Sequence, residues 1–303
     1  MSEALAIDIC VCTFRRPQIA DTLQSLAQLK LRPDWKIHVI IADNDETPNA
    51  QTTIEATALK YGLDFQYIHA PARNISIARN ACLTAATAPL LAFIDDDEKA
   101  TPEWLEALIT RMNDAHADIV LGPVKAIYGR GVPGWMERGN FHSTKPVWVR
   151  YKIITGYSCN VLIRRTHPAF RDLRFHEDLG RSGGEDTVFF SEAHKAGAKI
   201  EYAANAVVTE IVASERAEIK WLIRRSFRSG QTHGYLLLLK AHPIFTRIKN
   251  VPMATAKSFF CFAMSILNIK PERGLYWLLR GTMHAGVVAR LLGVRELQPY
   301  GQA

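Results

Sequence analysis

The chain has 303 residues, of which 48% are hydrophobic, which suffices for one large domain or for a domain with an appendage. The net charge is +7, and Lys and Arg far outnumber Asp and Glu from Ile219 onward, which suggests an acidic partner such as nucleic acid, an anionic membrane or a phosphorylated substrate. The five cysteines form no Cys-x-x-Cys pair and no even-numbered framework, so reduced cytosolic thiols are expected.

The first half of the chain alternates between apolar, strand-like segments and helical ones. This alternation predicts a parallel sheet with helices on both faces. No glycine-rich phosphate loop follows the first strand, so neither a dinucleotide-binding fold nor a P-loop is supported. The predicted strands cover residues 7–13, 36–43, 63–68 and 90–95, and the predicted helices cover 18–29, a stretch that ends at 60, and 75–86.

Polar side chains follow three of these strands, at residues 13–16, 43–45 and 95–97. Ligands bind outside the carboxyl ends of parallel strands, so we expect the three clusters to meet at one edge of the sheet. The third cluster is an acidic run whose carboxylates repel one another, and Mg²⁺ or Mn²⁺ would turn that repulsion into binding. An acidic loop or a helix N-cap before Thr101 is the alternative, and this segment leaves both interpretations open.

The middle of the chain is less regular. Residues 125–149 are rich in Gly, Pro and Trp and predict a mobile loop over the site, and residues 154–164 are strand-like. Glu185 and Asp186 directly precede a helical run over residues 187–193, whose start carries a partial positive charge. A structural cap would explain one of these carboxylates but explains two adjacent ones poorly.

The last third of the chain is basic and apolar. Residues 221–228 predict a basic amphipathic helix, and residues 258–267 are strongly apolar but well short of the roughly 20 residues needed to span a bilayer. Short apolar faces between basic residues indicate helices that lie in a membrane interface, and a helical subdomain packed on the core or on a partner is the alternative. The basic residues are Arg247, Lys249, Lys257, Lys270 and Arg273.

Five motifs, in a sensible order and spacing, together resemble a family 2 glycosyltransferase with the GT-A fold, which binds nucleotide-diphospho-sugars. The resemblance implies a GT-A domain over residues 1–230 and a helical, membrane-associated region over residues 231–303. The segment 225–230 resembles the branch that builds bacterial exopolysaccharides of the succinoglycan type. The motifs lie at residues 9–17, 41–44, 78–80, 95–97 and 184–186.

The resemblance implies a pocket for the nucleotide. Asp43 would accept a hydrogen bond from a uracil ring, and an Asx turn with Asn44 is an alternative that the sequence leaves open. Thr13, Arg15 and Arg79 would line this pocket. The forked guanidinium of Arg79 suits a diphosphate because it donates two parallel hydrogen bonds.

The same resemblance implies a metal site in the acidic run. Asp97 and Asp95 would bind Mg²⁺ or Mn²⁺, and Asp95 or Asp96 would reach hydroxyls of the sugar or the ribose. Relatives often carry a metal-binding His after the strand that follows the Glu-Asp motif. This sequence offers Glu210 there, an oxygen ligand that we leave unassigned.

The resemblance also implies the catalytic pair. Asp186 would be the general base that activates the acceptor hydroxyl, and Glu185 would orient the acceptor or assist. Direct displacement of UDP would invert the anomeric configuration. Donor or acceptor contacts, or equally a tight turn and buried polar pairing, are expected at Gly156, Ser158 and Asn160.

We therefore expect an inverting, metal-dependent glycosyltransferase on the cytoplasmic face of the inner membrane. It would move a sugar, with glucose as the family-weighted choice, from a UDP-sugar to a lipid-linked, undecaprenyl-type oligosaccharide in exopolysaccharide synthesis. A phosphatase of the haloacid dehalogenase type is not supported, because Lys99 stands where that motif needs Thr. No nucleic-acid motif is visible, so the alternative is a membrane-bound scaffold or a nucleotide-binding protein without enzymatic activity.

Overall fold

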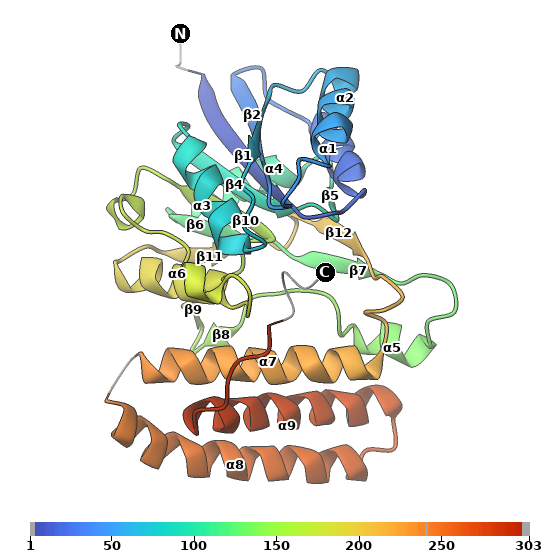
Figure 1. Ribbon diagram of the computed structural model, residues 1–303, viewed down its shortest axis with the longest axis vertical. Helices are drawn as coiled ribbons and strands as arrows, with labels where there is room; N and C mark the ends of the chain where they lie inside the picture. Colours follow the sequence, from blue (N-terminus) through green and yellow to red (C-terminus); the bar gives the residue numbers. More distant parts are fainter. Residues whose placement is uncertain (1–3, 240–241, 299–303) are drawn as a thin grey trace.

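The computed structural model describes residues 4–239 and 242–298, and its centre is a seven-stranded sheet (Figure 1). Its strands are β1 (Leu5–Thr13), β2 (Trp35–Asp43), β3 (Phe65–His69), β4 (Leu90–Asp95), β6 (Ile119–Leu121), β10 (Asn160–Arg164) and β11 (Ile200–Tyr202). They lie in the order β11-β6-β10-β4-β1-β2-β3, and β10 runs antiparallel to β4 and β6. The other neighbouring pairs are parallel, so the mostly parallel sheet predicted from the sequence is confirmed.

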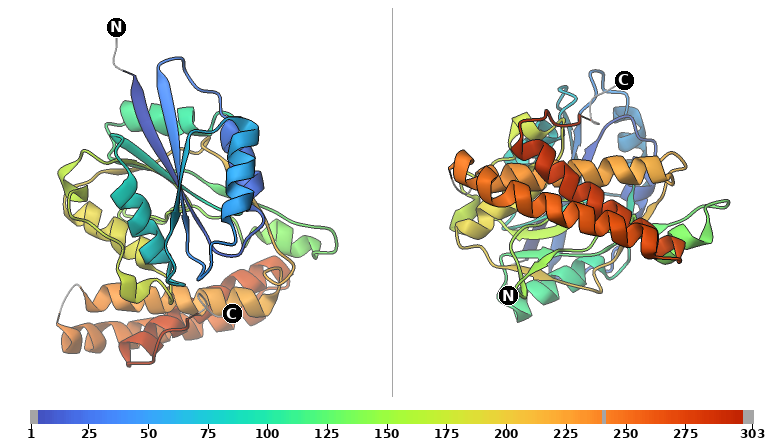
Figure 2. Two further views of the ribbon diagram at one scale, coloured as in Figure 1. Left: turned by 45° about the horizontal axis from the view of Figure 1, so that its top comes forward. Right: turned by 90° about the horizontal axis from the view of Figure 1, so that it is seen from below.

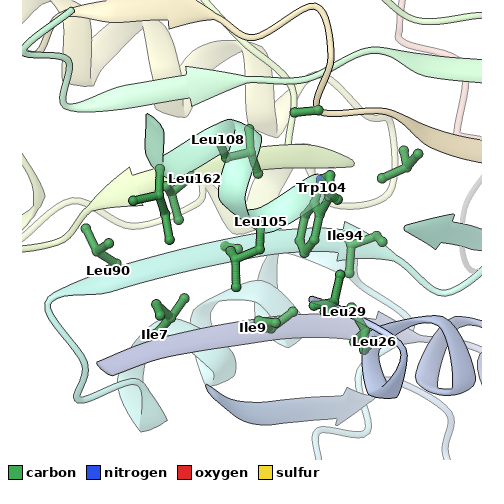
Figure 3. Packing of buried hydrophobic residues seen from close by; sticks show 14 of the residues in the cluster. Ile7, Ile9, Leu26, Leu29, Leu90, Ile94, Trp104, Leu105, Leu108 and Leu162 are labelled. Carbon is green, nitrogen blue, oxygen red and sulfur yellow. The ribbon is translucent and has the colours of Figure 1, made fainter. Parts of the chain in front are cut away.

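Helices cover both faces of this sheet. Side chains of a strand alternate between the two faces, so Ile7 and Ile9 of β1 pack in one apolar layer and Cys10 packs in the other. Figure 3 shows Ile7 and Ile9 in the first layer together with Trp104 and Leu105. The helices that supply the first layer are α1 (Ile19–Ala27), α2 (Gln51–Tyr61) and α4 (Trp104–Asp114), and those that supply the second are α3 (Ile75–Ala85) and α6 (Glu185–Lys195).

A second, three-stranded sheet lies beside the end of β4. It consists of β5 (Glu98–Ala100), β12 (Val208–Ile211) and β7 (Val124–Ile127), with β12 in the middle. The β5–β12 register places Glu210 opposite Glu98, directly after the acidic run. The fold therefore brings the end of β12 to the end of β4, about 110 residues away along the chain.

Two sequence predictions for the middle of the chain need correction. Residues 125–149 are not one loop, because they contain β7, the helix α5 (Gly134–Gly139) and the strand β8 (Trp148–Val149), which pairs with β9 (Lys152–Ile153). The strand predicted over residues 154–164 begins only at Asn160. The preceding segment leaves the sheet because Thr155 donates to the carbonyl of Thr187 (2.8 Å) and Tyr157 donates to the carbonyl of Gly122 (2.7 Å). Two short 3₁₀ helices follow, η1 (Pro168–Phe170) and η2 (Glu177–Leu179).

Three long helices form a layer below the central sheet (Figure 1): α7 (Ile219–Leu238), α8 (Pro243–Leu267) and α9 (Pro271–Leu291). α9 lies between α7 and α8 (Figures 1 and 2). Two glycines let α7 and α9 approach closely, since a Cβ atom on Gly230 would lie 1.9 Å from the carbonyl oxygen of Met283 and one on Gly286 would lie 2.0 Å from that of Phe227. The boundary expected after residue 230 falls inside α7.

The C-terminal helices are longer than the apolar runs that indicated them. The runs at 258–267 and 277–279 are parts of α8 and α9, and α8 continues through Pro252. Within the described residues, no helix combines the length and the apolar character that crossing a membrane requires.

Candidate active site

The three polar clusters predicted to converge lie at adjoining strand ends. β1 is parallel to both β2 and β4, with Thr13 opposite Asp43 and Cys12 opposite Asp95. The carboxyl ends of the three strands therefore meet at one edge of the sheet, as expected for a ligand site of a parallel sheet. Thr13 is buried, and its hydroxyl oxygen has no hydrogen-bond partner among the described residues.

A pocket of about 220 Å³ opens beside the end of β2. Asp43 is buried in its wall and accepts hydrogen bonds from the Tyr67 hydroxyl (2.9 Å) and from the backbone N–H of Asp45 (3.1 Å). The second bond closes an Asx turn over Asn44, so the turn that the sequence left open is present, in a residue that also lines the pocket. The lining residues include Arg15, Arg16, Pro17, Asp43, Asp45 and Asn49.

The sequence assigned no role to two residues that hold this pocket's wall, Tyr67 and Asp45. Burial, together with the hydrogen bond to Asp43, raises the pKa of Tyr67, so its hydroxyl stays a donor. Arg15 donates to Asp45 (2.9 Å), which lowers the pKa of that carboxyl group. Arg15 has a left-handed backbone (φ 54°), and its guanidinium lies over the ring of Phe14 (5.1 Å). The sequence could identify the polar residues at the strand ends. It could not identify their hydrogen-bond partners, because those partners come from other elements of the fold.

The acidic run is bound by two arginines. Arg16, which follows β1, contacts Asp96 (3.3 Å) and pairs with Asp97. Arg216, between β12 and α7, pairs with Glu210 and also lies 3.5 Å from Asp97. The structure thus brings Asp97 and Glu210 together through one guanidinium group, although the sequence left Glu210 unassigned.

The donor set at this edge fits a hard divalent cation. Asp96 has a side chain only 7% exposed, and its Oδ2 atom has no hydrogen-bond partner among the described residues. Burial raises the pKa of Asp96 to about 7, and burial together with the charge of Asp97 raises that of Glu210 to about 7. In addition, Asp95 and Glu98 hold carboxylate oxygens within 4.8 Å of each other, and the Cys159 sulfur beside them is a soft ligand that a hard cation does not prefer. The positive groups around these carboxylates do not fully neutralise them, and a cation would supply the remaining positive charge.

Arg79 connects the acidic run to the predicted catalytic pair. It lies buried on α3, pairs with Glu185 and places its Nη2 atom 3.8 Å from Oδ1 of Asp95. Its guanidinium also lies over the ring of Phe175 (5.5 Å). Burial raises the pKa of Glu185, while the charge of Arg79 opposes that rise. Glu185 is therefore committed to a buried ion pair, so its neighbour Asp186 is the more accessible carboxylate.

Asp186 lies in the first turn of α6. Its Oδ1 atom accepts from the backbone N–H of Thr187 (2.6 Å). Gly184, before the helix, has a left-handed backbone (φ 95°), and a Cβ atom there would lie 2.4 Å from Thr232 of α7. The turn that carries Asp186 thus packs directly on α7.

Asn160 takes the structural one of its two predicted roles. It is fully buried, accepts from the indole N–H of Trp104 (2.8 Å) and donates to the carbonyls of Pro123 (3.0 Å) and Ala206 (2.8 Å). These bonds join β10 to α4 and to the start of the second sheet. A Cβ atom on Gly156 would meet Leu121 at 3.0 Å, and Ser158 is buried nearby.

Comparisons with known proteins agree on one family. The model of the family "Glycosyl transferase family 2" matches residues 8–168. The succinoglycan biosynthesis protein ExoM of Rhizobium meliloti (strain 1021) is 46% identical over 301 residues, which is 99% of this chain and 97% of that protein. The poly(ribitol-phosphate) beta-N-acetylglucosaminyltransferase TarS of Staphylococcus aureus (strain MW2) is 26% identical over 58% of this chain and 30% of its own length.

Two solved structures share the fold. The crystal structure of S. aureus TarS 1-349 in complex with UDP-GlcNAc has a TM-score of 0.55 at 17% identity and covers 99% of both chains. The mannosyltransferase PcManGT from Pyrobaculum calidifontis, in complex with GDP-Man and Mn²⁺, has a TM-score of 0.64 at 16% identity and covers 96% of this chain and 88% of its own. At these identities the likeness concerns the fold.

Proposed function

Because the chain belongs to glycosyl transferase family 2 and has the GT-A fold, we propose that it transfers a hexosyl group, with glucose as the first candidate, from a UDP-sugar to a lipid-linked oligosaccharide. The product would enter a succinoglycan-type exopolysaccharide, as the name of the 46% identical relative suggests. The observation that carries this proposal is the shared edge of the sheet, where the pocket beside Asp43 adjoins the acidic run at the end of β4.

The pocket would bind the nucleotide part of the donor, and the acidic run would bind the cation and the sugar. Asp43, held by Tyr67, would accept the N–H of the uracil ring, and Arg15 and Thr13 would line the nucleotide. Asp97 and Asp95 would hold Mg²⁺ or Mn²⁺, and the Oδ2 atom of Asp96 would reach a hydroxyl of the ribose or the sugar while its Oδ1 atom contacts Arg16. When bound, the cation would neutralise the negative charge that develops on the departing diphosphate.

The residues of α6 would act on the acceptor. Asp186 accepts the proton of the attacking hydroxyl as that oxygen approaches the anomeric carbon, opposite the departing UDP. Glu185 and Arg79 hold the first turn of α6 in place. Since a single displacement occurs, the anomeric configuration inverts, and an α-linked donor yields a β-glycoside.

An anionic membrane surface is the proposed location of the acceptor, on the cytoplasmic face of the inner membrane. α8 lies on the outside of the helical layer, farthest from the sheet (Figure 1). Its apolar side chains are exposed beside basic ones, a combination that suits an interfacial helix. The large exposed apolar residues of α8 are Ile244, Phe245, Ile248, Met253, Phe259, Phe260, Ile266 and Leu267, and the exposed basic ones are Arg247, Lys249 and Lys257.

The reaction is tested by measuring UDP release from a panel of UDP-sugars, with and without Mn²⁺ and with a lipid-linked acceptor. We expect release from one donor that requires Mn²⁺ and that falls to background in Asp97→Asn. Failure of the wild-type protein to bind UDP at all would overturn the proposal, because the pocket beside Asp43 would then have another purpose.

The membrane location is tested separately with vesicles. Binding to vesicles that contain anionic lipid should fall about tenfold in Phe259→Ser/Phe260→Ser, because two exposed aromatic side chains no longer enter the interface. Equal binding by this variant and the wild-type protein, or binding that is indifferent to salt, would argue against interfacial association.

A further inference from the structure

Arg216 is shared by two carboxylates from different elements. Its Nη1 atom pairs with Oε1 of Glu210 on β12 and lies 3.5 Å from Oδ2 of Asp97 in the turn after β4. The carboxylate side chains are only 18% and 15% exposed, so water screens this contact weakly. One guanidinium therefore holds the second sheet to the acidic run.

The carboxylates around Asp97 outnumber the positively charged groups that contact them. Arg16 approaches from the other side and pairs with Asp96 and Asp97. Three carboxylates thus share two guanidinium groups, and the Oδ2 atom of Asp96 stays buried with no hydrogen-bond partner among the described residues. The cluster therefore combines carboxylate oxygens, which suit a hard cation, with fewer positive charges than negative ones.

We propose that Glu210 is a ligand of the divalent cation and that Arg216 is a resident counter-cation which this ion must displace. The inference rests on the proposed function in one respect, namely that a divalent cation binds at Asp97. An ion on the oxygens of Asp97 and Glu210 and a guanidinium on the same oxygens repel each other strongly in this poorly screened site. The two cations therefore compete, and Arg216 sets the affinity for the metal.

The contacts of Arg216 restrict where it can go after displacement. Its backbone carbonyl accepts from Nε2 of His142 (2.8 Å), and its guanidinium lies over the ring of Trp221 (5.9 Å). The backbone is thus anchored, and the side chain can swing while it stays at the same edge of the sheet. A nucleoside diphosphate offers the displaced guanidinium new oxygen acceptors. Binding of the cation and of UDP should therefore be mutually favourable.

The test measures binding of Mn²⁺ alone, by calorimetry or electron paramagnetic resonance, to the full-length protein without nucleotide. Arg216→Gln should bind Mn²⁺ about tenfold more tightly than the wild type, because the competing charge is gone. Arg216→Lys, which keeps the charge, should stay within about threefold of the wild type. Glu210→Gln should bind at least about fivefold more weakly. A matched control is Arg111→Gln, which removes the same charge from an ion pair with Glu201 remote from the acidic run.

A second measurement uses UDP. In the wild type, UDP should tighten Mn²⁺ binding by about tenfold, and in Arg216→Gln this coupling should be smaller, because the contribution of the displaced guanidinium is lost while the attraction between the cation and the diphosphate remains. Unchanged or weaker Mn²⁺ binding by Arg216→Gln, or full Mn²⁺ affinity in Glu210→Gln, would overturn the inference.

The two proposals can fail separately. Competition between Arg216 and Mn²⁺ without any UDP-sugar turnover would uphold this inference and defeat the proposed reaction. Turnover of a UDP-sugar with identical Mn²⁺ affinities in all of the variants would do the reverse.

Discussion

Arg79 and Glu185 form a buried ion pair that joins α3 to the first turn of α6. Their side chains are only 9% and 6% exposed, and Asp186 is the next residue along the chain. The position of the proposed base therefore depends on an arginine that the sequence suggested for the diphosphate. A buried pair of this kind costs free energy to desolvate, but loss of one partner leaves the other charge uncompensated.

Removal of one partner should therefore be severe. We expect Arg79→Leu to lower the free energy of unfolding by about 3–5 kcal/mol, and Arg79→Leu/Glu185→Leu to recover most of that loss. Urea unfolding of the two variants measures the difference. Arg111→Gln, which breaks an exposed pair, should cost less than about 1 kcal/mol. A double variant as unstable as the single one would show that the pair is not the source of the effect.

Substitution of Asp186 should separate chemistry from binding. Asp186→Asn should reduce UDP release in the presence of acceptor by about 10²- to 10⁴-fold, because the amide cannot take the proton of the hydroxyl. Its UDP affinity should match that of the wild type, since Asp186 does not line the pocket beside Asp43. Steady-state kinetics measure the expected loss of activity, and equilibrium binding measures the expected unchanged affinity for UDP. Activity near the wild-type level would remove Asp186 from the role of base.

The raised pKa of Asp96 should appear in the pH dependence of stability. Burial raises this pKa to about 7 from its usual value of 3.8, so between these values the folded protein binds more protons than the unfolded chain. The free energy of unfolding should therefore fall as the pH rises from about 4 to about 7, and Glu210, whose pKa is also about 7, adds to the same slope.

Asp96→Asn isolates this effect. The variant should be more stable than the wild type at pH 8, by about 1–4 kcal/mol, and the difference should be clearly smaller at pH 5 and approach zero only near pH 4. Urea unfolding without metal or nucleotide at the two pH values provides the comparison. A stability difference that does not change with pH would mean that the carboxyl group ionises normally in the folded protein.

The close approach of α7 and α9 should make Gly286 sensitive to a single methyl group. Gly286→Ala places a carbon atom against the backbone carbonyl of Phe227, so the helices must separate, and we expect a loss of about 1–3 kcal/mol. Because α7 also packs on Gly184, UDP release should fall as well. Gly129→Ala is the control, since its new methyl group meets open space. Equal melting temperatures for both variants would contradict this packing.

The amino-acid pattern alone was enough to predict the first four strands and the edge of the sheet at which the site lies. Hydrophobic alternation is a local property, and it identified β1, β2, β3 and β4 to within a few residues, whereas the short strands β6 and β11 were not predicted. Parallel strands end at the same edge, so Thr13, Asp43 and Asp95 had to come together once the strands were known. The GT-A resemblance follows from residues at those ends.

Which charges meet could be seen only in the folded chain. Arg16, Asp97 and Arg216 lie far apart in the chain, and no spacing rule connects them, because long-range pairing depends on how the second sheet packs against β4. The helices α8 and α9 were visible as short apolar runs, but their full length depends on packing against neighbouring helices. Local pattern sets secondary structure, whereas ion pairs between distant elements arise from the packing that brings those elements together.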